Sequence, residues 1–350
     1  MTIKLLTRQI SDKKYPLIIG EVSANHNNSL KKIFKIIDCA AEIGLEAIKF
    51  QTYDLNQMTL NSKKKQFLLK KNFSNNKWNN RSLYSLYKEA HLPFEWHRDI
   101  FNRAKKKGLI CFSSVFDERS LNLLKGINCP AYKIASLESM HFPLIKKVIE
   151  ENKLIIVSTG TLDIKEIDEL IKFLKKNNAK FIIMHCVTQY PAANDNCNLS
   201  MISYLRKKYK CNIGFSDHTK DSLAALTAVG LGANIIEKHF MLNDNEKTLD
   251  SEFSFGPKKM EKLIMDSKLV WQSIGEIKNK ISPAEKFYKK FSRSIYACKD
   301  ILKNEKISKK NVRVIRPGFG IEPKFYNQIL GKKVKQNIKF GEPILFNKLN

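Results

Sequence analysis

Residues 154–160 read LIIVSTG, and residues 163–173, a few positions further on, read DIKEIDELIKF. The first run is apolar and rich in β-branched residues, and it has the length of one buried strand. In the second run the apolar residues recur at the spacing of one helical face, which predicts a helix. Together the two runs predict a strand followed by a helix, the repeating unit of a parallel α/β fold.

The same unit recurs along the chain. Helical spacing is also found at Leu30–Ile43, where Asn28 or Ser29 can cap the helix, and at Pro257–Ile274. Strands that alternate with helices eight times before residue 275 predict an α/β fold of the (β/α)₈ TIM barrel type. A doubly wound open sheet is the alternative, but no G-x-G-x-x-G sequence follows the first strand. The expected strands are Tyr15–Ser23, Ala47–Tyr53, Leu109–Val115, Ala131–Ser136, Leu154–Gly160, Lys180–Cys186, Asn212–His218 and Ile235–Phe240.

The character of the sequence changes after residue 275. The stretch 276–290 is polar and predicts a linker. Beyond it, Ser294–Ile301 and Lys310–Ile315 predict short strands in a unit that is too small for a second barrel. We therefore expect a barrel domain over residues 1–275, a linker over 276–290 and a small strand-rich domain over 291–350. Within the barrel, Asn61–Asn80 is rich in lysine and asparagine and predicts a long loop.

The charge of the chain is strongly positive. Its 350 residues carry a formal net charge of +28, and 43% of them are hydrophobic, enough for a sizeable core. A charge of this size would suit a nucleic-acid-binding protein. However, the lysines are spread along the whole chain and no RRM, helix-turn-helix or zinc-finger pattern occurs. We therefore expect no nucleic-acid partner, and a field that attracts anionic substrates instead.

The seven cysteines include no C-x-x-C pair. Unpaired thiols are typical of a protein kept in a reducing cytoplasm. The first residues lack the apolar segment of a secretory signal, and no stretch approaches the ~20 apolar residues of a membrane span. The sequence therefore predicts a cytoplasmic protein with no membrane contact.

Polar residues gather where the expected strands end. In a (β/α)₈ barrel the carboxyl ends of the strands meet at one face, and that face carries the active site. The polar residues at these ends are Glu21, Lys49, Gln51, Ser114, Lys133, Ser136, Glu138, Ser158, Thr188, Tyr190, Ser216, His218, Glu237 and His239.

Two histidines end neighbouring strands. His218 and His239 could converge on a divalent ion that keeps open positions for water and substrate. Each could equally be a structural hydrogen-bonding residue. A catalytic triad at Ser216-Asp217-His218 is excluded, because neighbours on a strand point to opposite sides and no G-x-S-x-G turn occurs.

Three serines and one lysine indicate a phosphate pocket. Ser114, Ser136 and Ser158 lie at successive strand ends beside Lys133, and hydroxyl and ammonium groups bind phosphate oxygens. Serines that only satisfy the backbone of βα turns are the alternative. The carboxylates at strand ends could act as general bases, accept sugar hydroxyls or pair with a lysine.

The motifs at these strand ends resemble the sialic acid synthase family. They are Glu21 with Ser23-Ala24-Asn25-His26-Asn27, Lys49-Phe50-Gln51-Thr52-Tyr53, Tyr132-Lys133-Ile134-Ala135-Ser136 with Glu138, Val157-Ser158-Thr159-Gly160, Phe215-Ser216-Asp217-His218-Thr219 and Glu237-Lys238-His239-Phe240. The resemblance covers nearly the whole chain. It implies a TIM barrel followed by an antifreeze-like SAF domain, and an enzyme that condenses phosphoenolpyruvate with an amino sugar into a nonulosonic acid.

Within that family, several stretches resemble the branch that makes pseudaminic acid. Among them are Ser82–Tyr87, Asp250–Ser254 and Arg316–Gly320. This resemblance implies the substrate 2,4-diacetamido-2,4,6-trideoxy-β-L-altropyranose, with C–C bond formation and loss of phosphate by C–O cleavage. The alternatives within the family are synthesis of N-acetylneuraminate or of legionaminic acid.

The resemblance also implies a role for each site residue. His218 and His239 would bind a divalent metal, Mn²⁺, Co²⁺ or Mg²⁺, and would share the catalytic role with Glu21 and Glu138. Arg316 would reach the active site of the partner subunit in a domain-swapped homodimer. The residues expected to bind phosphoenolpyruvate are Lys133, Ser136, Ser114, Ser158, Thr188 and Ser216, and those expected to bind the sugar are Gln51, Tyr190, Asp250 and Arg316.

Overall fold

The computed structural model describes residues 2–69 and 77–350. The chain divides into two compact units, Met1–Gly275 and Glu276–Asn350, and each is described here by itself. The expected long loop at 61–80 is described only in part, because residues 70–76 lie outside the described residues. On either side of that gap, Leu68 and Ser82 form an isolated antiparallel β-bridge.

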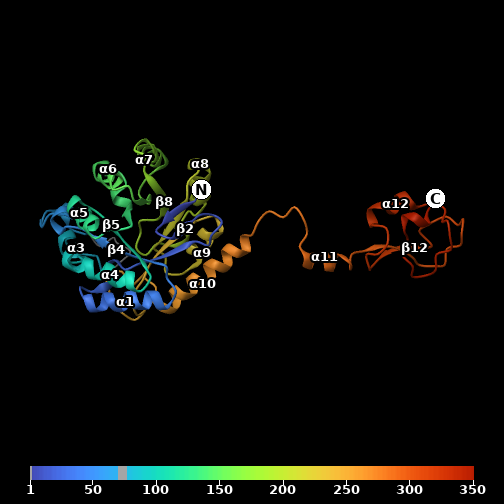
Figure 1. Ribbon diagram of the computed structural model, residues 1–350, viewed down its shortest axis with the longest axis horizontal. Helices are drawn as coiled ribbons and strands as arrows, with labels where there is room; N and C mark the ends of the chain where they lie inside the picture. The colour runs from blue at the N-terminus through green and yellow to red at the C-terminus, as the bar shows by residue number, and fades with distance from the viewer. Residues whose placement is uncertain (1, 70–76) are drawn as a thin grey trace. The chain divides into compact units, whose positions relative to one another are not determined.

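The first unit is a closed parallel barrel of eight strands, as the sequence predicts (Figure 1). Its strands pair in the order β10-β3-β4-β5-β6-β7-β8-β9, and β10 closes the ring by pairing with β3 in parallel. The strands are β3 (Leu17–Glu21), β4 (Ala47–Thr52), β5 (Ile110–Val115), β6 (Ala131–Ile134), β7 (Leu154–Ser158), β8 (Lys180–Cys186), β9 (Ile213–Asp217) and β10 (Ile235–His239).

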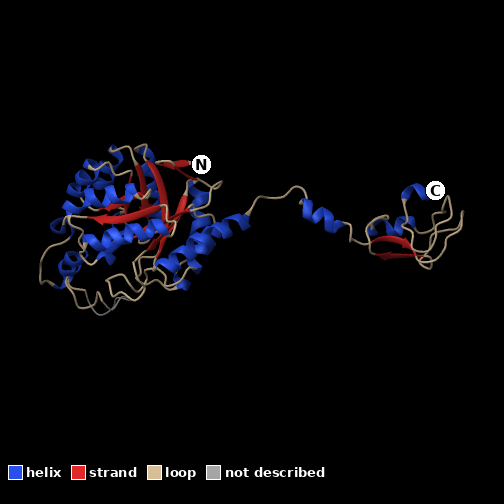
Figure 2. Cartoon of the chain, turned by 60° about the horizontal axis from the view of Figure 1, so that its bottom comes forward, coloured by secondary structure: helices blue, strands red, loops and turns tan. Residues whose placement is uncertain are grey.

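Helices surround the barrel, as Figure 2 shows. Their starts follow from capping chemistry. Ser29 accepts a hydrogen bond from the Lys32 amide at the start of α1, and Asp163 and Glu166 form a reciprocal capping box at the start of α7. The helices of this unit are α1 (Leu30–Glu42), α2 (Leu55–Met58), α3 (Leu83–Ala90), α4 (His97–Lys106), α5 (Glu118–Gly126), α6 (Phe142–Glu150), α7 (Ile164–Lys176), α8 (Ser200–Tyr209), α9 (Leu223–Gly230) and α10 (Pro257–Ile274).

A small hairpin precedes the barrel, and the sequence analysis does not anticipate it. β1 (Ile3–Leu5) and β2 (Arg8–Ile10) pair in antiparallel fashion, and Leu5 and Ile10 are each 1% exposed within the hydrophobic core. Asp12, just after the hairpin, accepts a hydrogen bond from Asn234, which directly precedes β10. The hairpin therefore packs at the amino ends of the strands, opposite the expected active face.

The second unit has its own core. β11 (Ser294–Ala297) pairs in antiparallel fashion with β12 (Val312–Ile315), and residues such as Ile295, Ile301 and Ile338 are buried around this pair. The unit also contains α12 (Tyr326–Ile329). The stretch expected to be a linker is not wholly irregular, because α11 (Pro283–Lys289) begins at a capping box formed by Ser282 and Glu285. No helix in the described part of the chain is long and apolar enough to cross a membrane.

Candidate active site

Two adjoining cavities open at the carboxyl ends of the barrel strands. The first, the strand pocket, is lined mainly by residues of the strands themselves: Glu21, Lys49, Gln51, Ser114, Lys133, Ala135, Ser136, Ser158, Cys186, Tyr190, Ser216, His218, Glu237 and His239. The second, the loop cavity, is lined mainly by residues that follow the strands: Ser23, Ala24, Gln51, Tyr53, Met58, Trp78, Leu86, Tyr87, Ala90, Phe116, Ala135, Ser136, Leu137, Glu138, Thr188, Tyr190, His239, Leu249, Asp250 and Phe253.

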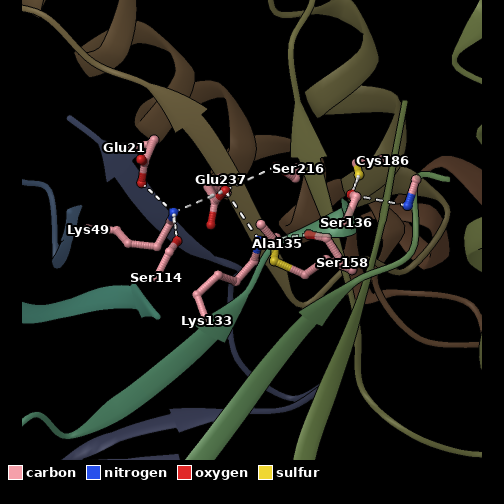
Figure 3. A network of polar contacts seen from close by, with 12 residues as sticks. Glu21, Lys49, Ser114, Lys133, Ala135, Ser136, Ser158, Cys186, Ser216 and Glu237 are labelled. Carbon is pink, nitrogen blue, oxygen red and sulfur yellow. Dashed lines mark hydrogen bonds and ion pairs between the residues drawn. The ribbon is translucent and has the colours of Figure 1, made fainter. Parts of the chain in front are cut away.

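Lys49 lies at the centre of a charged network in the strand pocket (Figure 3). Its Nζ is 2.5 Å from Glu21 Oε2 and 3.7 Å from Glu237 Oε1, and it donates a hydrogen bond of 2.9 Å to Ser114 Oγ. Gln51 Nε2 extends the network by donating to Glu21 Oε1 at 3.0 Å. The strand register brings these groups together, because Glu21 pairs with Lys49 and Gln51 pairs with Ser114.

Lys133 forms the other half of the network. Its Nζ donates to Ser158 Oγ at 2.7 Å and lies 3.7 Å from Glu237 Oε1. Ser216 Oγ donates to the same Glu237 oxygen at 3.1 Å. One carboxylate is therefore shared by two ammonium groups at 3.7 Å each, and Lys49 has a second, closer carboxylate partner in Glu21.

Burial and neighbouring charges set the protonation of this network. Burial raises the pKa of Glu21 even though Lys49 opposes the shift. Burial also acts to raise the pKa of Glu237, but the adjacent Lys133 and Lys49 outweigh it and lower that pKa. For Lys133, burial is the largest effect and lowers the pKa. Glu237 therefore stays ionised, while Glu21 is the carboxyl that takes up a proton more easily.

Ser136 lies on the wall of the strand pocket opposite Lys49. Its Oγ is 2.9 Å from Cys186 Sγ and accepts a hydrogen bond of 3.2 Å from the Gly160 amide. A Cβ at residue 160 would lie 2.5 Å from Cys186 Sγ and 2.5 Å from Thr188 Oγ1. Only glycine fits there, so the backbone can approach the Ser136 hydroxyl closely enough to hold it.

The two histidines have the geometry of a ligand pair. Their ring centroids are 5.5 Å apart, and His218 Nδ1 is held by the Val187 carbonyl at 2.9 Å. His239 Nδ1 lies 3.6 Å from Asp250 Oδ2. Each Nδ1 faces a group outside the strand pocket, although His239 Nδ1 makes no hydrogen bond among the described residues. His218 Nε2 lies 3.5 Å from Ser216 Oγ of the strand pocket, so Nε2 is the ring atom that could bind an ion there.

The electrostatics of the pair also suit a metal. Burial lowers the pKa of His218 to about 4 and lowers that of His239 well below its usual range. Both imidazoles are therefore neutral at neutral pH, the form that binds metal ions. Among residues 2–69 and 77–350, no group of three or more His, Cys, Asp or Glu side chains is arranged to hold a metal. Two imidazoles alone leave the remaining coordination positions to water and substrate oxygens.

The loop cavity has a different character. It has about 930 Å³ of empty space, part of it open to solvent, and apolar side chains such as Met58, Leu86 and Phe116 line much of it. Glu138 is its main carboxyl group. Burial raises the pKa of Glu138 to about 7, and its Oε2 has no hydrogen-bond partner among the described residues. A carboxyl with this pKa exchanges protons readily near neutrality, which suits a general acid or base.

Aromatic rings cover the histidines on the side of the loop cavity. The Tyr190 ring lies 4.2 Å from that of His218, and the Phe253 ring lies 4.7 Å from that of His239. Trp78 packs on Tyr190 with a centroid separation of 5.3 Å. Asp250 is buried beside them and accepts a hydrogen bond of 3.3 Å from the Ala24 amide, and burial raises its pKa.

The structure brings together every barrel residue that the sequence analysis assigns to the site. Each of them lines the strand pocket, the loop cavity or both. Five residues line both cavities and so form their border: Gln51, Ala135, Ser136, Tyr190 and His239. Arg316 is exposed and follows β12 in the second unit.

Two residues at the centre of the network, Lys49 and Glu237, were given no role by the sequence analysis. The two-residue alternation along a strand could have identified them. Lys49 shares a face with Gln51, and Glu237 shares a face with His239. Tyr53, which that alternation also places on the Lys49 face, instead follows the end of β4, and its hydroxyl donates to the Tyr87 carbonyl at 2.7 Å.

Comparison with known proteins matches both units. Residues 36–279 match the NeuB family, and residues 292–350 match the SAF domain. The chain is 40% identical to a pseudaminic acid synthase of Campylobacter jejuni, over 95% of this chain and 96% of that protein. It is 34% identical to an N,N′-diacetyllegionaminic acid synthase of the same species, over 95% of this chain and 99% of that protein.

A solved structure shares the fold. It is an N-acetylneuraminic acid (sialic acid) synthetase from Leptospira borgpetersenii, which superposes with a TM-score of 0.74 at 30% sequence identity. The match covers 82% of this chain and 95% of the Leptospira chain.

Proposed function

The chain belongs to the NeuB family of sialic acid synthases, and from this membership we propose that it is a pseudaminic acid synthase. It would condense phosphoenolpyruvate, 2,4-diacetamido-2,4,6-trideoxy-β-L-altropyranose and water to give pseudaminic acid and phosphate. As a phosphoenolpyruvate-dependent nonulosonic acid synthase, it is a transferase. The higher identity to the pseudaminic acid synthase, 40% against 34% for the legionaminic acid enzyme, supports this sugar over its nearest competitor.

The observation that carries the proposal is the border between the two cavities. A charged strand pocket suits an anion with a phosphate and a carboxylate, and an adjoining, largely apolar loop cavity suits a sugar with acetamido and methyl groups. Gln51, Ser136, Tyr190 and His239 line both cavities. The two substrates would therefore meet at these residues, where the new carbon–carbon bond forms.

Phosphoenolpyruvate would bind in the strand pocket. Lys133 with Ser158, and Lys49 with Ser114, form two ammonium–hydroxyl pairs that can donate to phosphate and carboxylate oxygens. Glu237 lies 3.7 Å from both ammonium groups, and Glu21 is the closer partner of Lys49. The incoming anion would strengthen the contacts of the lysines, since its oxygens can approach them more closely than Glu237 does.

His218 and His239 would hold a divalent ion through their Nε2 atoms. Bound there, Mn²⁺, Co²⁺ or Mg²⁺ supplies Lewis-acid polarisation of the sugar aldehyde. The Val187 carbonyl orients His218, and Asp250 faces the far nitrogen of His239.

The reaction follows from these positions. The open-chain sugar presents its aldehyde at the border, and C3 of phosphoenolpyruvate attacks it, so that positive charge develops at C2. Water adds at C2 and gives its proton to Glu138, whose pKa of about 7 suits a base at neutral pH. The former aldehyde oxygen, left as an alkoxide by the attack, takes up one proton in turn and becomes a hydroxyl, and Glu138 returns to its ionised form. The resulting hemiketal phosphate then breaks its C–O bond and releases inorganic phosphate to the strand pocket.

A panel of sugars tests the proposal. Phosphate release from phosphoenolpyruvate would be followed with the diacetamido-trideoxy sugar of the altro configuration, its legionaminic acid counterpart and N-acetylmannosamine. We expect turnover with the first sugar to exceed turnover with the others. Equal or better turnover with the legionaminic acid precursor would contradict the assigned sugar, and no turnover with any sugar would contradict the reaction.

Metal dependence is tested on the same assay. Chelation should abolish phosphate release, and Mn²⁺, Co²⁺ or Mg²⁺ should restore it. His239→Ala should lose activity while keeping its thermal unfolding temperature, because a ligand is removed and no large core cavity is created. Full activity in excess chelator would show that His218 and His239 serve another purpose.

We also propose that the enzyme works in the cytoplasm as a homodimer whose subunits each contribute Arg316 to the partner's loop cavity. The exposed Arg316 side chain supports this role, as does the small size of the domain that carries it. Heterodimers of Arg316→Ala and Lys133→Ala chains would contain one intact site and one doubly damaged site. Random pairing should restore about a quarter of wild-type activity. Confirmed heterodimers no more active than the parent variants would place Arg316 outside the partner's site.

A further inference from the structure

A second charged pair lies on the outer side of the barrel wall, behind the histidines. Side chains alternate along β10, so Glu237 and His239 face the strand pocket while Lys238 points outward toward the helices. Lys238 pairs in register with Asp217 of β9. Both side chains are 0% exposed, and Lys238 Nζ is 2.9 Å from Asp217 Oδ2.

The Lys238 ammonium also holds the loop that follows β9. Its Nζ donates to the Thr219 carbonyl at 2.5 Å and lies 3.3 Å from the Asp221 carbonyl. Asp217 Oδ1 accepts from the Thr219 amide at 2.8 Å. The ammonium also lies 4.4 Å from the centre of the Phe255 ring. We call Lys238, Asp217 and Thr219 the outer lock.

The outer lock fixes the residues on either side of His218. That histidine lies between Asp217 and Thr219, and both of these are tied to Lys238. His239 follows Lys238 directly in the chain. Each histidine is therefore next in sequence to a member of the outer lock. The histidines face the inner side of the barrel wall, and the outer lock lies on the outer side.

Fold stability alone does not account for an ion pair in this position. Removing two charges from water costs several kcal/mol, and well-packed apolar side chains of similar volume often give equal or greater stability. What the ammonium provides, and an apolar side chain does not, is simultaneous hydrogen bonding to a carboxylate and to loop carbonyls in fixed directions. Such directional ties determine where a loop places its side chains.

We propose that Lys238 is a positioning residue that sets the affinity of the His218–His239 pair for its divalent ion. This inference rests on the proposed function, in which the two histidines hold the ion. Without the ammonium, the loop at 217–221 loses its common anchor and the His218 ring moves relative to His239. Metal affinity then falls, whereas the strand pocket keeps Lys49, Lys133 and their serines.

The test is a metal titration that does not depend on turnover. Mn²⁺ would be titrated into the full-length protein in the presence of phosphoenolpyruvate, and the free ion would be measured by its EPR signal. We expect Lys238→Met to weaken Mn²⁺ binding by about 10- to 100-fold, the usual effect of losing a residue that orients a metal ligand. Affinity for phosphoenolpyruvate alone, measured by calorimetry, should change by less than about twofold, because no contact of the strand pocket is removed.

A control variant tests whether the loss of a charge pair elsewhere in the barrel weakens Mn²⁺ binding. Arg103→Met breaks the Arg103–Asp38 contact of 2.9 Å between α4 and α1, away from the histidines, and should leave Mn²⁺ affinity unchanged. Should Lys238→Met fail to fold, Asp217→Asn keeps the shape of the outer lock and removes its negative charge and one of its two acceptor oxygens. That variant should bind Mn²⁺ more weakly than wild type, by a smaller factor than the lysine variant.

The outcomes are distinct. A folded Lys238→Met or Asp217→Asn protein with wild-type Mn²⁺ affinity overturns the role of the outer lock, and the proposed function stands if the wild type is active. Equal weakening in Arg103→Met would overturn it as well, because the effect would then be general. Wild-type protein that binds no Mn²⁺ would overturn both this inference and the metal part of the proposed function.

Discussion

The strand pocket and the loop cavity share five lining residues and differ in almost everything else. In the strand pocket, Lys49 and Lys133 lie on β4 and β6 and hold a fixed set of carboxylates and hydroxyls. In the loop cavity, Trp78 and Asp250 come from segments between strands and helices, and apolar surface dominates. Under the proposed function, binding of phosphoenolpyruvate would be built into strand register, whereas recognition of the particular sugar would be assigned to loops.

The two regions therefore respond differently to change. A strand residue in the pocket cannot move without its neighbours, since its position follows from pairing on both sides. Loop residues can change with less effect on the barrel. Variation among related enzymes is therefore expected in the loops. The following predictions test this contrast, beginning with the largest expected effect.

Glu138→Gln should give the largest loss. The substitution keeps the size of the side chain and removes its ability to accept a proton, so kcat for phosphate release should fall by about 10²- to 10⁴-fold. Substrate KM values should change little, because no charged contact of the strand pocket is removed. Steady-state kinetics with both substrates varied would measure this.

Glu252 offers a control for Glu138. It lies two residues after Asp250 and does not line either cavity. Glu252→Gln should retain nearly full kcat. If Glu138→Gln retained it as well, the loop cavity would hold the sugar without supplying the base.

Lys133→Met should act mainly on phosphoenolpyruvate. Loss of one charge-assisted contact to the anion costs about 2 kcal/mol, so the KM for phosphoenolpyruvate should rise about 30-fold while that for the sugar changes far less. The exposed Lys153 provides a matched control, and Lys153→Met should leave both values unchanged. An equal rise in both KM values would mean that the two cavities do not bind separate substrates.

The pH dependence of kcat should report Glu138. Burial raises its pKa from the usual 4.5 to about 7, so a base at this position is lost by protonation as the pH falls through about 7. We expect kcat to fall about tenfold between about pH 8 and about pH 6 in wild type. The residual kcat of Glu138→Gln should not fall over this pH range. If the fall persists unchanged, the group that titrates is not Glu138.

Trp78→Ala should have the smallest effect and should act on the sugar alone. Trp78 lines the loop cavity and packs on Tyr190, so its loss removes apolar surface from the sugar's side of the site. A loss of about 1 kcal/mol of sugar binding corresponds to about a fivefold rise in the sugar KM. Trp271, which donates to the Asp12 carbonyl away from both cavities, gives the control Trp271→Ala. A larger effect on phosphoenolpyruvate than on the sugar would contradict the division between the cavities.

Sequence reasoning recovers the barrel because each strand–helix unit carries its own pattern. Runs such as Leu154–Gly160 contain enough consecutive apolar residues to identify a strand, and the chain order of eight such runs fixes the topology. The hairpin of β1 and β2 escapes this reasoning, because strands of three residues carry too little periodicity. The helix α11 escapes it too, since a polar stretch with a capping box resembles a linker.

The site is predictable to a similar degree. Strand alternation places polar residues on one face of the barrel, so the members of the strand pocket can be gathered from the sequence. It cannot say which of them are central, because that depends on how neighbouring strands are paired. Lys49 and Glu237 lie at the centre of the network only because the register sets β4 beside β3 and β10 beside β9.

The register between β9 and β10 has a consequence for how the chain reaches its fold. The same alignment sets Ser216 beside Glu237 on the inner side of the wall and Asp217 beside Lys238 on the outer side. A slip of one residue would separate Lys238 from Asp217, and breaking a buried ion pair costs about 3–5 kcal/mol. It would also separate Ser216 from Glu237. Misaligned barrels would therefore be less stable than the native one. In this way the paired polar residues on both sides of the wall also favour a single strand alignment.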